Sequence, residues 1–163
     1  MGLGAMVKGL AGGGNPAALG DRVYRAGLAA DLTGLGTVNL FQISGGDVLL
    51  AGIYGKVTTQ IGAVGATTIQ LDLVPTGGAS GVLCVAVAIN TDVVNTIYTI
   101  TGDVAVGMDV GTSIGVGHYQ ETNTMVLVPG IIGMIVAVSV NTGVIDWTLH
   151  YVPLDTDSKV NPL

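Results

Sequence analysis

The stretch that decides the fold is VSVNTGVIDWTLHYVPLD, residues 138–155, in which apolar and polar side chains alternate. A period of two residues is typical of a β-strand with one face buried and the other in water. The apolar set is Ile145, Trp147, Leu149 and Tyr151, and the polar set is Asp146, Thr148 and His150. We therefore predict a strand here, with Trp147 as an anchor of the core or of a subunit interface.

The polar set has residue types that occur in active sites, but a strand spaces them too widely. Asp146 and His150 would lie about 13 to 14 Å apart, since alternate residues of a strand are roughly 6.8 Å apart. Zinc bonds are only about 2.0 to 2.2 Å long, so the two side chains could not share a metal ion. Thr148 could touch either neighbour, but the sequence offers it no activating base. We expect a polar strand face rather than a catalytic site.

The chain before this stretch also reads as short strands separated by turn residues. No convincing helix intervenes, which favours an antiparallel sandwich. Asn141-Thr142-Gly143 predicts a hairpin with glycine at positive φ. The expected fold is all-β, a jelly-roll-like antiparallel β-sandwich of about eight strands. These strands cover residues 38–44, 47–61 (with a bend at Gly52 and Gly55), 66–74, 81–89 (apolar on both faces and so covered on both), 96–101, 124–128, 131–140 and 143–152.

Residues 1–37 differ from the rest, because they are rich in Gly and Ala and lack alternation. They could form a disordered tail, or an arm that becomes ordered against a neighbouring subunit. Their apolar residues exceed what a solvated tail needs, which favours the arm. We predict an N-terminal extended arm over 1–37 and a sandwich domain over 38–163, and expect the domain to stay folded when residues 1–30 are removed.

The composition predicts an assembly rather than an isolated molecule. Apolar residues make up 49% of the chain and charged residues 10%, too few charges to coat a monomer. We expect a homo-oligomer. The longest apolar run, 125–140, is too short and too interrupted to span a membrane, so no membrane partner is expected.

Charge is distributed unevenly along the chain. Lys8, Arg22 and Arg25 outnumber Asp21 within residues 1–25, whereas two lysines face ten acidic residues after that point. An acidic body should repel nucleic acid, so no nucleic-acid partner is expected. The basic residues of the arm, with its only aromatic residue, are candidate contacts to another protein: Lys8, Arg22, Tyr24 and Arg25.

Catalytic, cofactor-binding and metal-binding residues are not expected, and neither is any cofactor. The single cysteine, Cys84, lies in an apolar run and is predicted to be buried. The glycine-rich stretch 11–20 lacks the pattern of a phosphate-binding loop. An alternative from another class is a glycan- or metal-binding β-sandwich enzyme that uses the 102–123 loop, with Asp103, Asp109, His118 and Glu121.

VNLFQISGGDVLLAGIYGKVTTQIGA (38–63) and LVPGIIGMIVAVSVNTGVIDWTLHYVPLD (127–155) resemble small β-rich virion structural proteins of tailed bacteriophages. Several of those are capsid decoration, or cement, proteins. The resemblance covers about half the chain and lies in a rhythm of strands and glycines, not in a catalytic motif. It implies a non-enzymatic protein made in the host cytoplasm and located on the capsid surface. Its partners would be the major capsid protein and, in a homotrimer, other copies of itself. A head fibre, tail or host-adsorption component of the virion is the alternative.

Overall fold

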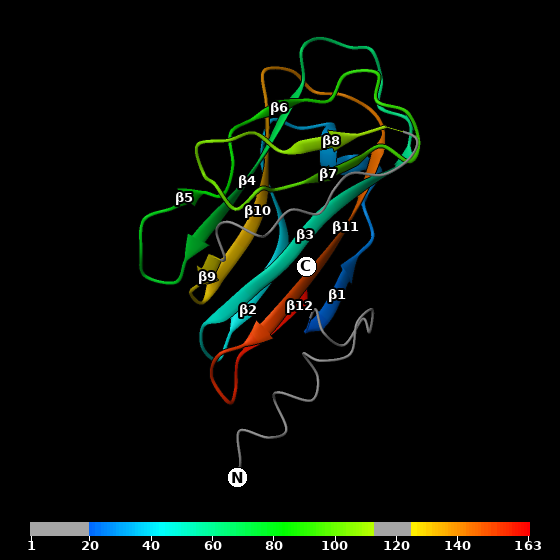
Figure 1. Cartoon of the computed structure of the whole chain (residues 1–163). Helices are drawn as coiled ribbons and strands as arrows, with labels where there is room; N and C mark the ends of the chain where they lie inside the picture. Colours follow the sequence, from blue (N-terminus) through cyan, green and yellow to red (C-terminus); the bar gives the residue numbers. More distant parts are fainter. Residues whose placement is uncertain (1–19, 113–124) are drawn as a thin grey trace.

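The structure is a computed structural model that describes residues 20–112 and 125–163. Two antiparallel sheets pack face to face (Figure 1). The β11 sheet has the order β1 (Asp21–Arg25), β11 (Val144–Pro153), β3 (Val48–Thr59), β7 (Ile97–Thr99) and β8 (Asp109–Gly111), with β9 (Met125–Leu127) also on β3. The β10 sheet has the order β12 (Lys159–Pro162), β2 (Gly36–Ser44), β10 (Gly130–Ala137), β4 (Thr68–Pro75) and β5 (Gly81–Val82), with β6 (Val87–Ala88) also on β4.

The strand pairing is that of a jelly roll. Strands from the two halves of the chain pair in nested fashion: β1 with β11, β2 with β10, β3 with β7 and β9, and β4 with β5 and β6. Pairing of β11 with β3 joins the strands of one sheet, and pairing of β10 with β4 joins those of the other. The all-β, jelly-roll-like sandwich is confirmed. The described strands outnumber the expected eight because several are only two or three residues long.

Apolar and polar side chains alternate along β11 and β4, and the apolar ones form part of the core between the sheets. Ile145, Trp147, Leu149 and Tyr151 are all buried, as the sequence predicts. Gly55 of β3 pairs with Trp147, and a Cβ at Gly55 would lie 2.8 Å from the indole ring. Gly55 therefore makes room for the indole, while Gly52 lies beside a register shift opposite His150 and Tyr151. Such a shift is the bulge expected of a glycine in a strand.

The predicted hairpin at Asn141-Thr142-Gly143 is wrong. Gly143 has the expected positive φ, 122°, but β10 and β11 belong to different sheets. Residues 138–143 therefore cross from one sheet to the other. Asn141 holds this crossover: its backbone N–H donates to Leu32 O, and its side-chain amide donates to Gly62 O and Thr67 Oγ1.

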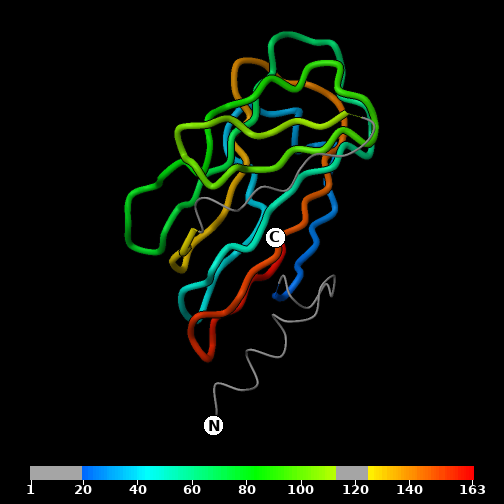
Figure 2. Tube along the Cα trace, viewed as in Figure 1, coloured from blue at the N-terminus to red at the C-terminus, as the bar shows by residue number. Residues whose placement is uncertain are grey.

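The predicted boundary of the arm is also wrong. Asp21–Arg25 form strand β1, which pairs along its length with β11, and the 3-10 helix η2 (Ala29–Leu32) places Leu32 in the core. The last strand, β12, lies beside this first described strand (Figure 2). Residues 20–37 thus belong to the sandwich, and residues 1–19 of the proposed arm lie outside the described residues.

The 81–89 segment is not the continuous doubly covered strand that was predicted. It forms only β5 and β6, with Leu83, Cys84 and Ile89 buried and Val82 and Val85 exposed. Only one side of this apolar segment is covered by the described chain. Among the described residues, no helix is long and apolar enough to cross a membrane.

Candidate binding surface

Six residues that are distant in the sequence meet on the outer face of the β11 sheet. The register places Tyr24 of β1 and Tyr54 of β3 on either side of Thr148. Two positions along β11 in one direction, Arg22 pairs with His150. Two positions in the other direction, Lys56 pairs with Asp146. Paired residues of neighbouring strands point to the same face, and Trp147 points inward, so these side chains point outward. We name the set the tyrosine surface: Arg22, Tyr24, Tyr54, Lys56, Asp146 and His150.

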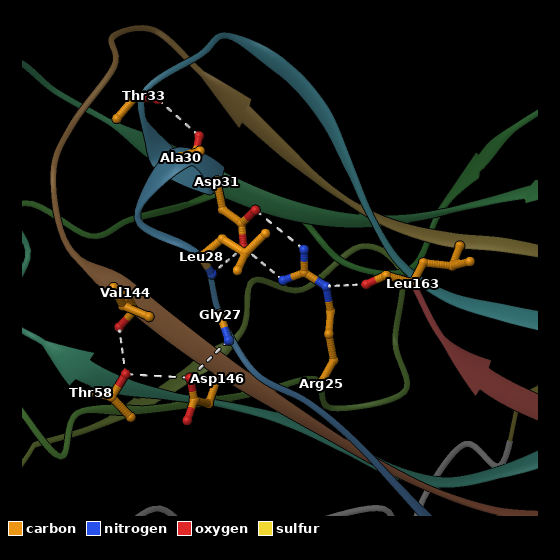
Figure 3. Close-up of polar contacts among 10 residues, drawn as sticks. All are labelled: Arg25, Gly27, Leu28, Ala30, Asp31, Thr33, Thr58, Val144, Asp146 and Leu163. Carbon is orange, nitrogen blue, oxygen red and sulfur yellow. Dashed lines mark hydrogen bonds and ion pairs between the residues drawn. The ribbon is translucent and has the colours of Figure 1, made fainter.

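Asp146 organises one side of this surface. Its Oδ2 accepts a hydrogen bond of 2.6 Å from the Tyr24 hydroxyl. Its Oδ1 accepts one of 2.9 Å from the backbone N–H of Gly27, and a longer one from the Thr58 hydroxyl, as Figure 3 shows. The hydrogen bond to Asp146 raises the pKa of Tyr24, and the Arg22 guanidinium opposes this weakly. Asp146 thus positions the exposed tyrosine and fastens the end of β1.

Ring contacts order the rest of the surface. The Tyr54 and His150 rings stack with centroids 6.4 Å apart and an angle of 22° between their planes. The Arg22 guanidinium lies 6.0 Å from the centre of the Tyr24 ring, within the range of a cation–π contact. Two tyrosines, a histidine and two basic side chains are therefore presented together on one face of the sheet.

The location of the aromatic residues sets this surface apart. Six aromatic residues lie in the described part of the chain, and Phe41, Tyr98, Trp147 and Tyr151 are buried in the core. The other two are Tyr24, whose exposed fraction is 47%, and the half-buried Tyr54. Tyrosine and arginine are enriched among the residues that contribute most to protein–protein binding.

The predicted contact residues have separate locations. Arg22 and Tyr24 are exposed on the tyrosine surface, while Lys8 lies outside the described residues. Arg25 is buried, which corrects its assignment as a contact. Its Nη1 lies 2.7 Å from Asp31 Oδ2, and its Nε donates to the Leu163 carbonyl oxygen (Figure 3). The guanidinium therefore links β1 and η2 to the last residue of the chain.

The alternative site in the 102–123 loop is only partly described. Asp103 accepts a hydrogen bond from the Ala105 backbone N–H within its own turn, and Asp109 lies on β8 opposite Thr99. His118 and Glu121 lie outside the described residues. Over residues 20–112 and 125–163, no group of three or more His, Cys, Asp or Glu side chains is arranged to hold a metal ion.

Cys84 is buried, as predicted. Burial raises the pKa of its thiol, and the Leu71 backbone N–H lies 3.4 Å from its sulfur. A thiol in this setting packs as a small apolar side chain rather than acting as a nucleophile.

The sequence interpretation treated Arg22 and Tyr24 as part of an arm, and Asp146 and His150 as the wet face of a strand. The structure joins these two features through the β1–β11 pairing. Tyr54 and Lys56 were missed, although their alternation with Ile53, Gly55 and Val57 was a usable signal for an outward face.

Comparison with models of known protein families, with curated proteins and with solved structures finds no match for this chain.

Proposed function

We propose that this protein is a structural component of a virion, a capsid decoration protein that binds the major capsid protein and stabilises the icosahedral head. The tyrosine surface is the contact that we assign to this binding. The protein would be located on the capsid surface and act without chemistry, by bridging capsid subunits. Lys8 remains a predicted contact within residues 1–19.

One observation carries the proposal: both aromatic residues of the described chain that escape the core lie on the tyrosine surface. They are accompanied there by Arg22 and Lys56, two of the three exposed basic residues in the described chain. The remaining body is acidic and poor in aromatic side chains. Binding would therefore concentrate on this face, where buried tyrosine and arginine side chains could exclude water.

The test uses purified heads that lack the protein. Wild type, Tyr24→Ala/Tyr54→Ala and the exposed control Asp21→Ala are each mixed with heads, and bound copies and heat resistance of the heads are measured. We expect wild type and Asp21→Ala to bind and protect, and the double variant to bind at least tenfold more weakly, since hot-spot residues contribute about 2 kcal/mol or more.

Unchanged circular dichroism and melting temperature must accompany the loss of binding. Full binding by the folded double variant would refute the tyrosine surface as the contact. Failure of wild type to bind heads, combined with binding to tails, fibres or host cells, would favour the head-fibre, tail or adsorption alternative.

A further inference from the structure

Asp72 is the only charged residue in most of the β10 sheet. The strands β2, β4, β5, β6 and β10 contain no other charged side chain. Leu71 and Leu73, on either side of Asp72 along β4, are buried in the core, so the Asp72 carboxyl points to the outer face of this sheet. The tyrosine surface is on the outer face of the other sheet. A single carboxyl is therefore held on the side of the sandwich that faces away from the tyrosine surface.

This carboxyl lies in the space that a glycine leaves free. Gly133 of β10 pairs with Asp72, and a Cβ at Gly133 would lie 2.6 Å from Asp72 Oδ1 and in contact with the methyl group of Thr37. Oδ1 is fully buried there and has no hydrogen-bond partner among the described residues. Oδ2 is not enclosed in the same way, so it is the oxygen that a group from outside can reach.

No basic residue of the described chain is placed to neutralise this carboxylate. Arg22 and Lys56 lie on the opposite outer face, and Arg25 belongs to a buried ion pair of its own. Lys159 is on β12, three strands away from β4, which is about 14 Å at the usual spacing of strands. The Asp72 carboxylate is therefore without a counter-charge, and a buried charge without a partner costs stability.

The surroundings of Asp72 favour a lysine or arginine side chain as the missing partner. A metal ion would need more ligands, and among the described residues no group of three or more His, Cys, Asp or Glu side chains could hold one. Ile131 and Ile135 flank Gly133 on the same outer face and are half-buried. Lysine and arginine pack their methylene groups along apolar surface of this kind while the charged end reaches its partner. A charge that lowers stability is typical of a position kept for function.

We propose that the Asp72 carboxylate receives a lysine or arginine side chain of the major capsid protein, so that the outer face of the β10 sheet is a second capsid contact. The inference rests on the proposed function, because a protein that bridges two capsid subunits needs two contact surfaces. The tyrosine surface and Asp72 face opposite ways, so each can meet a different subunit. The carboxylate lowers the stability of the free protein and is neutralised only in the complex.

The test measures binding to immobilised heads that lack the protein, by surface plasmon resonance. Wild type is compared with Asp72→Asn and with the exposed control Asp21→Asn, which carries the same substitution. Asparagine has the shape of aspartate without its charge, so the cation of the capsid protein would be left buried and unpaired. We expect Asp72→Asn to bind about thirtyfold more weakly or worse, mainly through faster dissociation, as is usual when a buried charge pair loses one member. Asp21→Asn should bind as wild type does.

The melting temperature and the mass of the free proteins at pH 7 distinguish the capsid from other partners. Asp72→Asn should melt no lower than wild type, so a loss of binding cannot be due to unfolding. A lower melting temperature would mean that the carboxylate already has a cation in the free protein, such as Lys8, and would overturn the inference. A change in mass by light scattering would make a second copy the partner and would overturn it as well.

The binding results separate this inference from the proposed function. If wild type and Asp72→Asn bind heads equally, the inference is wrong and the proposed function stands. If wild type does not bind heads at all, the proposed function is wrong and the inference falls with it.

Discussion

At the scale of single residues, Arg25 shows how burial can reverse a functional assignment. Its guanidinium faces Asp31 in an ion pair whose side chains are only 7% and 10% exposed. Removing one partner of a buried pair leaves the other charge uncompensated. We predict that Arg25→Ala lowers the free energy of unfolding by about 3 kcal/mol. The exposed neighbour Arg22→Ala should change it by less than about 0.5 kcal/mol.

Urea denaturation followed by the fluorescence of Trp147, the only tryptophan of the chain, measures both variants. Equal losses for the two arginine variants would contradict the buried ion pair. The sequence could not predict this pair, because arginine is mostly exposed in proteins and the segment between Arg25 and Asp31 shows no regular period.

Asp72 provides a second prediction at this scale. The residue is 5% exposed, and its Oδ1 has no hydrogen-bond partner among the described residues. Burial raises the pKa of this carboxyl, while the backbone N–H groups of Gly133 and of Asp72 itself lower it in part. The folded state therefore holds the proton more tightly than the unfolded state. The contribution of the Asp72 carboxyl to the free energy of unfolding is therefore complete below its unfolded pKa, about 3.9. That contribution is lost as pH rises through the pKa of the folded state.

Asp72→Asn removes this titration and the buried charge. We expect the variant to be more stable than wild type by about 1 kcal/mol at pH 7, and the gain to shrink towards pH 3.5. Melting temperatures measured across this range test the sign, with the exposed Asp21→Asn as the control. A gain that grows as pH falls would contradict the raised pKa.

At the scale of elements, strand β1 changes where the chain can be cut. A truncation that removes residues 1–19 keeps β1 and should leave the melting temperature unchanged. One that removes residues 1–28 exposes the edge of β11 and leaves Asp31 without Arg25. We predict that the longer truncation lowers the melting temperature by more than about 10 °C, since each kcal/mol corresponds to several degrees in a domain of this size. Differential scanning calorimetry measures both, and equal melting temperatures would show that β1 adds nothing to the sandwich.

An element could be predicted from the sequence when its pattern lay in neighbouring residues of the chain. Strands such as β4 and β11 alternate with period two, so their positions and inward faces follow from sequence alone. The glycine at 143 was read as part of a hairpin because positive φ serves a tight turn and a crossover between sheets equally well. The tyrosine surface could be predicted only in pieces, because the β1–β11 pairing that assembles it joins residues more than 120 positions apart.

At the scale of the whole molecule, the nested pairing predicts slow folding. β1 pairs with β11, and β2 pairs with both β10 and β12, so neither sheet is complete until the C-terminal strands have formed. Proteins dominated by such distant contacts fold in milliseconds to seconds, because loop-closure entropy is lost before the contacts form.

Trp147 is fully buried between the sheets, so its fluorescence reports their closure. We expect refolding from urea to show a main phase slower than about 10 ms whose rate does not change with protein concentration. Any association of copies would add a separate phase that accelerates with concentration. A main phase complete within about 1 ms would mean that the sheets close before the distant strands pair, contrary to this topology.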